Sequence, residues 1–121
     1  MDLENMGLNE KLNLAGSDST PSEILRELAI DDEDLVREMV AFNLNAPEDG
    51  LSKLATDRDW GVRYYVAQNP KASSKILVKL FEYEKMCKKP NKGVIMRLYA
   101  NEKLPAFAKR VIETLFGEIL T

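Results

Sequence analysis

A gapless internal repeat of 26 residues constrains the fold of this chain more than any other feature. Residues 20–45 align with residues 46–71 at ten identical positions, among them Val36 with Val62. A fixed period of this length is typical of repeat proteins, in which each unit is one supersecondary element that stacks on the next. The sequence therefore predicts a row of equivalent units.

Each unit contains two stretches with the periodicity of amphipathic helices. In the first unit, Thr20 is the expected N-cap of the opening helix, and the second stretch places Val36, Met39 and Val40 on its inner face. Helical pairs this short cannot bury their apolar stripes alone, so each pair must stack on the next. We therefore expect an all-α fold, a short α-solenoid of stacked helical pairs.

The repeat also divides the chain. Residues 1–19 are predicted to be an N-terminal arm or a short helix with a linker, and both alternatives stay open. Residues 20–121 are predicted to form the helical repeat domain. Its expected parts are units near 20–45, 46–71 and 72–104, followed by a capping helix at 105–120.

Charged and polar residues recur along with the apolar ones. Asp31 and Arg37 of the first unit return as Asp57 and Arg63 in the second. A catalytic residue is needed once, whereas a group that links each helix turn to its neighbour is needed in every unit. The repetition therefore predicts structural ion pairs or caps, and the recurring asparagines are expected to form turns or caps at Asn43, Asn69 and Asn101.

These residues carry a resemblance to a known family. The run LATDRDWGVRYYVAQNPKASSKIL at 54–77, with a weaker copy at 28–51, resembles the bacterial leucine-rich repeat variant, whose units read LAxDxDxxVRxxVAxNPxxxxxxL, and more distantly the HEAT-like repeats. The resemblance implies a right-handed superhelix that serves as an interaction platform. One variant-repeat type holds an iron–sulfur cluster through several cysteines. Because this chain has Cys87 alone, no cofactor is expected.

Composition excludes much familiar enzyme chemistry. The chain has no histidine and one cysteine, which removes the common metal sites, histidine acid–base relays and intramolecular disulfides. Phosphate-binding glycine loops are absent as well. We therefore predict a non-enzymatic protein without catalytic, metal or cofactor sites. Cys87 lies beside Lys85, Lys88 and Lys89, which are expected to favour its thiolate.

Hydropathy and the first residues bear on location. No apolar run approaches the roughly 18 residues of a membrane span, and the sequence MDLENMGLNE at 1–10 is acidic where a signal peptide would be basic. We expect a cytoplasmic protein that does not contact the membrane.

The best candidates for partner contact are positions where the second unit departs from the first. Trp60 replaces Asp34 and Tyr64 replaces Glu38, so two aromatic residues four apart share one helix face. Trp and Tyr are enriched where interfaces concentrate their binding energy. The alternative is that Trp60 folds back onto the inserted loop or the N-terminal segment. Tyr65 is expected in the core.

Charge is distributed unevenly along the chain. Residues 1–60 carry 15 acidic and 5 basic side chains, whereas residues 61–121 carry 5 acidic and 12 basic ones. Such asymmetry can steer a partner or favour head-to-tail self-association, although solvated helix faces of different sign explain it equally well. One dense basic loop supplies four further partner-contact candidates: Lys85, Lys88, Lys89 and Lys92.

The leading prediction is a non-enzymatic protein–protein interaction module, a scaffold or adaptor. The alternative is a nucleic-acid-binding helical repeat protein that uses the basic C-terminal half. The acidic first units and the net charge of −3 weigh against that alternative.

Overall fold

The protein is built from helices stacked side by side. A computed structural model describes residues 2–121, and within this range it contains eight α-helices, one short 3-10 helix and no strand. The predicted all-α class is confirmed.

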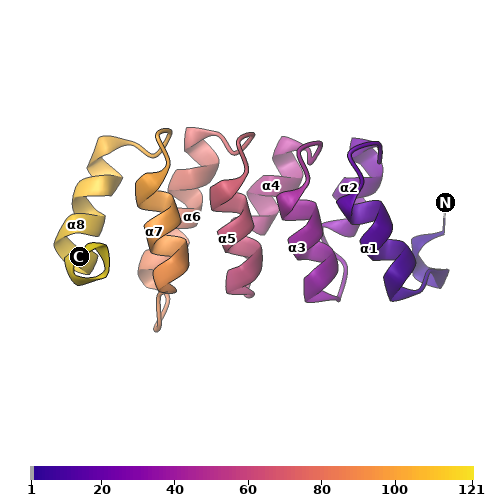
Figure 1. Cartoon of the computed structure of the whole chain (residues 1–121), viewed down its shortest axis with the longest axis horizontal. Coiled ribbons are helices and arrows are strands. Elements are labelled where there is room, and N and C mark those ends of the chain that lie inside the picture. Colours follow the sequence, from indigo (N-terminus) through magenta and orange to yellow (C-terminus); the bar gives the residue numbers. More distant parts are fainter. Residues whose placement is uncertain (1) are drawn as a thin grey trace.

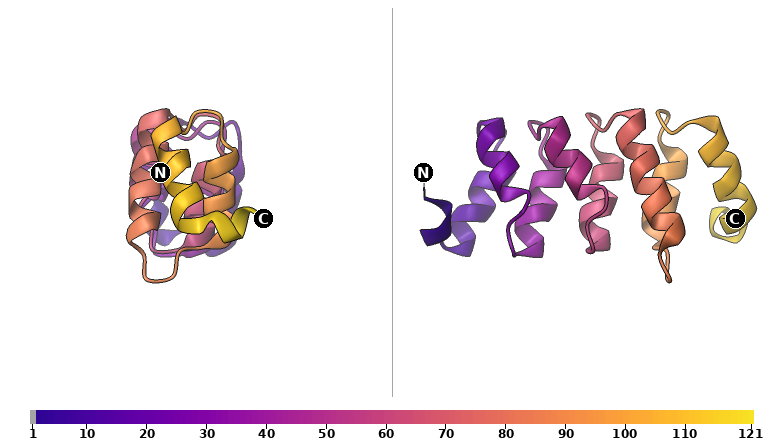
Figure 2. Two further views of the ribbon diagram at one scale, coloured as in Figure 1. Left: turned by 90° about the vertical axis from the view of Figure 1, so that its left-hand side faces the viewer. Right: turned by 180° about the vertical axis from the view of Figure 1, so that it is seen from behind.

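The helices form two rows that face each other (Figures 1 and 2). We call the row nearest the viewer in Figure 1 the front row, and in it α1 packs on α3, α3 on α5, and α5 on α7. Its members are α1 (Leu8–Gly16), α3 (Asp34–Phe42), α5 (Trp60–Gln68) and α7 (Lys92–Ala100). The back row contains α2 (Ser22–Leu28), α4 (Glu48–Leu54) and α6 (Ser74–Met86).

The two ends of the stack differ in structure. Helix α8 (Ala106–Leu120) packs against α7 and crosses the end of both rows (Figure 2, left). At the other end, the N-terminal segment forms a 3-10 helix at Leu3–Asn5 and then α1. Of the two alternatives left open for this segment, the structure shows the helix, and this helix is the first member of the front row.

The core lies between the two rows, and equivalent residues occupy equivalent places in it. Val36, Val62 and Val94 sit one helix apart along the front row, and none of them is exposed to solvent. Each helix buries one apolar stripe, as the repeat predicts, because each helical pair contributes the same apolar positions to a shared interior.

A row of ion pairs runs along the lower edge of the stack, and we call it the basic–acidic ladder. Arg37 donates from Nε to Asp57 Oδ2 at 2.8 Å and from Nη1 to the backbone carbonyl of Asp31 at 2.7 Å. Arg63 repeats both contacts, with Glu84 Oε1 at 2.8 Å and the carbonyl of Asp57 at 2.7 Å. Each arginine therefore ties its own loop to the acid of the next pair.

The predicted structural role of these charges agrees with the geometry, but their pairing differs from the expected one. Arg37 bonds the carboxylate of Asp57 in the following unit, whereas in its own unit it bonds the main chain of Asp31 and the carboxylate of Asp34. The ladder also begins one unit earlier than the repeat indicated, because Lys11 pairs with Asp31 at 2.8 Å. Lys11 lies 26 residues before Arg37, so it occupies the same place in the period.

A second row of contacts runs along the upper edge, and we call it the asparagine ladder. Asn69 donates from Nδ2 to the carbonyls of Ala41 and Asn43 at 2.8 and 3.0 Å, and its Oδ1 accepts from the amide of Lys71 at 2.9 Å. Asn43 makes the same bonds one unit earlier, and Asn101 donates to Ala67 one unit later. The predicted turn role is therefore joined by a bridge between neighbouring helices.

One predicted cap is wrong. Thr20 makes no capping bond to α2, whose N-cap is Pro21. Its hydroxyl instead donates to the carbonyl of Leu14 at 2.6 Å, which closes the end of α1. The same carbonyl also accepts from the amide of Ser17 at 3.3 Å, so the hydroxyl adds a second hydrogen bond at a helix end, where carbonyls lack intrahelical partners.

Candidate functional site

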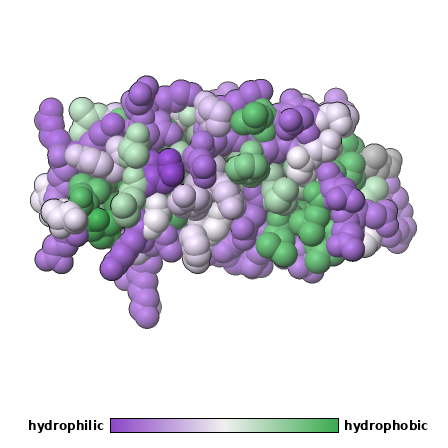
Figure 3. Space-filling view, in the orientation of Figure 1, coloured by the Kyte–Doolittle hydropathy of each residue, from purple (hydrophilic) through white to green (hydrophobic). Residues whose placement is uncertain are grey.

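The exposed side of the front row, which we call the front face, is rich in apolar side chains. Helix α3 presents Leu35, Met39 and Phe42 there, spaced four and three residues apart, and the Phe42 side chain is 54% exposed. In Figure 3 apolar surface gathers over the α1 and α3 half of this face. A groove of about 540 Å³ lies in it, lined by Leu12, Asn13, Leu35, Glu38, Met39, Phe42 and Tyr65.

Aromatic rings extend this surface toward α7. Phe42 and Tyr65 meet edge to face with their ring centroids 5.3 Å apart, and Tyr64 and Tyr65 do so at 5.6 Å. The guanidinium carbon of Arg97 lies 5.8 Å from the centre of the Tyr64 ring. Such contacts hold the rings in fixed positions, so this part of the surface is preorganised.

The back row offers a different surface. Two contacts across it join polar side chains: Arg26 bonds Asp49 at 2.7 Å, and Lys79 bonds Ser52 at 3.0 Å. A hollow of about 660 Å³ beside them includes Ile76 and Val78 in its lining, but helices α2 and α4 expose no large apolar side chain. This polar side is typical of a solvated face, and the contrast marks the front face as the candidate binding surface.

One acidic pair lies beside the apolar groove, and of its two members Glu38 lines the groove. Glu38 on α3 faces Asp59, the N-cap of α5, and its carboxyl group is packed so closely on Gly61 that a β-carbon there would lie 3.0 Å from it. Asp59 accepts from the amide of Gly61 through Oδ1 at 3.3 Å. Its Oδ2 is buried and meets no N–H or hydroxyl donor within the described residues, so the proton that Glu38 retains is the donor that can satisfy it.

Burial raises the pKa of Glu38 to about 7, and the hydrogen bond and negative charge of Asp59 add to the effect, as does Asp34. Two carboxyl groups this close cannot both be ionised cheaply, so about half of the molecules retain one proton on the pair at pH 7. The groove therefore combines apolar walls with the titratable carboxyl group of Glu38.

A second hollow, of about 360 Å³, lies at the lower edge and includes Arg37 and Asp57 in its lining. These two groups already bond each other in the basic–acidic ladder. In this hollow the charges of Arg37 and Asp57 are therefore already used to join neighbouring units of the stack.

The sequence-predicted aromatic pair is split by the structure. Trp60 is the first residue of α5 and is 54% exposed at the lower edge, as predicted for a contact residue. Tyr64 is only partly exposed, because its ring lies against Gly93 and beneath Arg97 of α7. The expectation that Tyr65 and Met39 lie in the core holds only in part, since both pack against the core but stay half-buried and line the groove.

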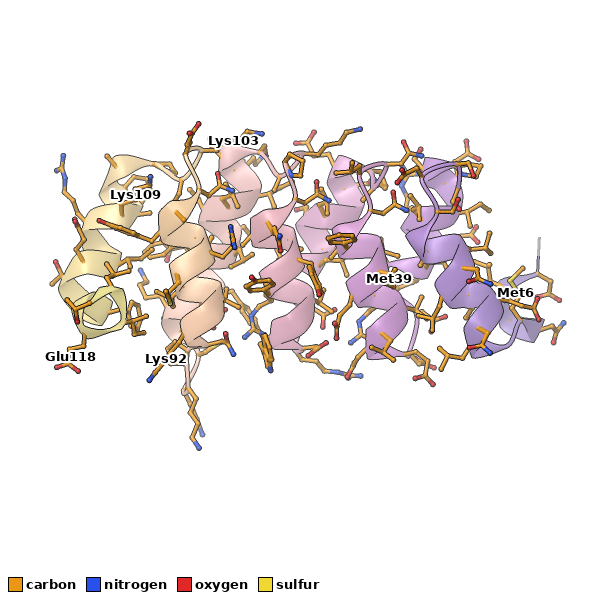
Figure 4. The ribbon with its side chains drawn as sticks, in the orientation of Figure 1. Met6, Met39, Lys92, Lys103, Lys109 and Glu118 are labelled. Atoms are coloured by element: carbon orange, nitrogen blue, oxygen red, sulfur yellow. The ribbon has the colours of Figure 1, made fainter. Side chains whose placement is uncertain are left out.

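The four candidate lysines lie at the lower edge, away from the groove. Lys85 pairs with Glu82 at 2.9 Å. Lys88, Lys89 and Lys92 are exposed on or beside the loop that projects below the two rows, where Figure 4 labels Lys92. The structure therefore does not join them to the apolar surface.

Cys87 differs from its sequence-based expectation. Its thiol donates a hydrogen bond to the carbonyl of Tyr83 at 3.4 Å. Burial raises the pKa of Cys87, the negative charge of Glu84 raises it further, and Arg63 only partly opposes this. The prediction that nearby lysines favour the thiolate is wrong, because the sulfur is sheltered, Lys85 pairs with Glu82, and Lys88 and Lys89 are exposed to solvent.

The described residues contain neither a metal-binding cluster nor a helix suited to cross a membrane. Across residues 2–121, no three His, Cys, Asp or Glu side chains are grouped so that they could hold a metal ion. Of the helices in the described chain, none combines the length and the apolar character that crossing a bilayer requires.

Sequence reasoning missed the groove residues Leu35, Phe42 and Glu38. A signal for them existed, since the helix at 34–42 is apolar on two adjacent stripes rather than one.

The comparison with known proteins found no match: no family model, curated protein or solved structure matches the chain.

Proposed function

We propose that this protein is a non-enzymatic protein–protein interaction module, a scaffold or adaptor built as a short right-handed α-solenoid of the HEAT-like or leucine-rich repeat variant kind. One observation carries the proposal: a continuous exposed surface of Leu, Met and aromatic side chains on the front face, held by a scaffold whose back face is polar. Exposed apolar surface of this extent favours a binding role.

The scaffold supports the proposal energetically. The basic–acidic and asparagine ladders fix each front helix to the next, so little conformational entropy is lost when a partner binds. Phe42 and Tyr65 supply rigid aromatic contact area at the centre of the surface, and Trp60 extends it at the lower edge. Large aromatic side chains of this kind carry most of the binding energy in many interfaces.

The test is affinity capture of partners from the organism's own cell extract with the wild-type chain and single variants as bait. Phe42→Asp is expected to lose the partners that the wild type retains. Ile30→Asp is the matched control, because Ile30 is also an exposed apolar residue but lies in the α2–α3 loop. Equal recovery on both variants would show that the front face is not the binding surface.

Trp60→Ala and Tyr64→Ala then test the two aromatic residues singled out by the sequence. A lower recovery of the same partner is expected for Trp60→Ala, whose side chain is accessible. Unchanged recovery with both variants would remove these residues from the interface.

A second candidate function, nucleic-acid binding, is favoured by one observation, the projecting loop with exposed Lys88, Lys89 and Lys92. Binding through these residues must weaken steeply as salt is added, because counterions compete for the phosphates. A DNA or RNA affinity that is salt-dependent and is lost in the Lys88→Glu, Lys89→Glu double variant would support it. Absence of such binding would leave protein recognition as the function.

A further inference from the structure

Free charges of opposite sign lie at two places along the lower edge. We call the α2–α3 loop the acidic loop, because it exposes Asp32 and Glu33, and the α6–α7 loop the basic loop, because it exposes Lys88 and Lys89. None of these four side chains forms an ion pair within the described chain. They are therefore available to a partner, whereas the charges of the basic–acidic ladder already pair with one another.

The most exposed apolar side chains lie at the same two loops. Ile30 in the acidic loop is 68% exposed, and Met86, the residue before the basic loop, is 79% exposed. These are the highest values among the large apolar residues of the described chain. Each loop therefore offers an apolar group beside charges of one sign, which is the composition of a small interface with a charged rim.

A hollow of about 450 Å³ lies beside the acidic loop. Its lining is apolar and acidic and includes Leu3, Glu4, Ile30, Asp31, Asp32 and the exposed Glu27 of α2. Lys11 is the one basic residue in this lining, and it already bonds Asp31. The hollow therefore suits an apolar side chain that arrives together with cations.

The basic loop has the matching shape and chemistry. Helix α6 has 13 residues, whereas α4 has 7, so the basic loop projects below the other loops of the lower edge (Figure 1). It presents Met86 next to two free lysines. Within one copy the two loops stand two helical pairs apart on the same stack, so a basic loop can reach an acidic loop only in another copy.

The repeat places these loops in register for a reciprocal contact. The α2–α3, α4–α5 and α6–α7 loops follow one another along the lower edge, one helical pair apart (Figure 1). Neighbouring packed helices lie about 8–10 Å apart, so the outer two loops are at nearly equal distances from the middle one. A two-fold axis at the middle loop therefore brings the acidic loop of each copy to the basic loop of the other.

We propose that this protein forms an antiparallel two-fold dimer through its lower edge, in which the basic loop of each copy enters the hollow beside the acidic loop of the other. Met86 of one copy then packs on Ile30 of the second copy, and the two free lysines face the two free acids. Trp60, 54% exposed at the start of α5, lies near the axis. The inference goes beyond the proposed function, because the groove on the front face stays free.

The experiment is sedimentation velocity of the full chain at increasing protein concentration, in low and in high salt. A monomer–dimer equilibrium is expected, and added salt is expected to shift it toward the monomer because salt screens exposed charges. Trp60 is the one tryptophan of the chain. Its fluorescence emission is therefore expected to move to shorter wavelength as the dimer forms and shelters the indole ring from water.

Two charge-reversal variants test the pairing of the loops. Lys88→Glu with Lys89→Glu makes both loops acidic, and Asp32→Lys with Glu33→Lys makes both loops basic. Each double variant alone is expected to stay monomeric. In an equimolar mixture every acidic loop again meets a basic one, so a mixed dimer is expected to form, and its formation shows that both variants are folded.

The matched control is Lys71→Glu with Lys75→Glu. It makes the same change in net charge as the reversal of the basic loop, but at exposed positions near the upper edge, in the α5–α6 loop and the first turn of α6. This control is expected to dimerise as the wild type does.

Three results would overturn the inference. The wild type could stay monomeric at every concentration, its dimer could persist in both charge-reversal variants, or the assembly could keep growing as an open head-to-tail chain.

The variants that test the proposed function fail separately from this dimer. Phe42→Asp is expected to lose captured partners and to dimerise normally, whereas Ile30→Asp is expected to keep the partners and to weaken the dimer. Loss of the dimer in Phe42→Asp, with the dimer of Ile30→Asp unchanged, would move the contact between copies to the front face and overturn the lower-edge interface.

Discussion

Replacing Glu38 by glutamine removes a proton equilibrium that opposes folding above neutral pH. In the folded chain the pKa of Glu38 is raised from 4.5 to about 7, so the folded state keeps a proton that the unfolded chain has released. Between these two pH values the folded state binds more protons than the unfolded state. The free energy of unfolding therefore falls as pH rises from about 4.5 to about 7 and stays lowered above it.

The size of the effect follows from the two proton affinities. A pKa of about 7 in place of 4.5 sets an upper bound of about 3 kcal/mol. The carboxyl group is partly exposed, and solvent screening reduces the expected loss to about 1–2 kcal/mol. Because the sequence has no histidine, no other side chain with an ordinary pKa titrates between pH 5 and 8.

The assay is urea unfolding followed by far-ultraviolet circular dichroism at pH 5 and pH 8. Glu38→Gln is expected to be nearly as stable as the wild type at pH 5 and about 1–2 kcal/mol more stable at pH 8. The control Glu27→Gln is expected to show no pH-dependent difference. If wild type and Glu38→Gln differ by the same amount at both pH values, the acidic pair does not share a proton and the reasoning fails.

Three further predictions concern the scaffold and the thiol. Asn69→Ala leaves buried main-chain groups without partners and is expected to lower the free energy of unfolding, measured by urea melts, by about 2–4 kcal/mol. The control Asn13→Ala, at an exposed position, is expected to change it by less than about 0.5 kcal/mol. Equal losses for the two variants would rule out the bridging role of Asn69. Glu84→Gln leaves Arg63 without its anion in a buried pair and is expected to lower the free energy of unfolding by about 3 kcal/mol. The additional substitution Arg63→Met should restore part of this loss. An unchanged stability of Glu84→Gln in urea melts would contradict the prediction. Because the pKa of Cys87 is raised by burial, iodoacetamide at pH 8 should alkylate it more slowly than glutathione, and a rate equal to or above that of glutathione would show the thiol to be open and activated.

The repeat made much of the architecture predictable. Positions that recur every 26 residues with apolar side chains, such as Val36 and Val62, are buried in equivalent sites. The recurring charges were predictable as structural groups, but their register was not. The acid that pairs with Arg63 is Glu84, although the period points to position 83, which is Tyr83. Helix α6 is longer than α2 and α4, and its extra turn moves the carboxylate to a new place.

The front face was harder to predict for a physical reason. On α3 the stripe through Val36 and Val40 and the stripe through Leu35 and Met39 both have helical spacing. Only the packing of one row on the other decides which stripe is buried, and the sequence of one helix does not contain that information. The pairing of Glu38 with Asp59 depends on the same packing, since the two residues belong to successive units.

The links of the two ladders also bear on how such a chain changes in length. Arg37 and Asn69 each bond groups in an adjoining unit, through atoms that the units at 20–45 and 46–71 supply 26 residues apart. A second copy of residues 46–71 inserted after residue 45 would therefore meet matching donors and acceptors on both sides. The front face of such a chain can be lengthened by whole helical pairs, through gene duplication or by design, without a new kind of contact between units.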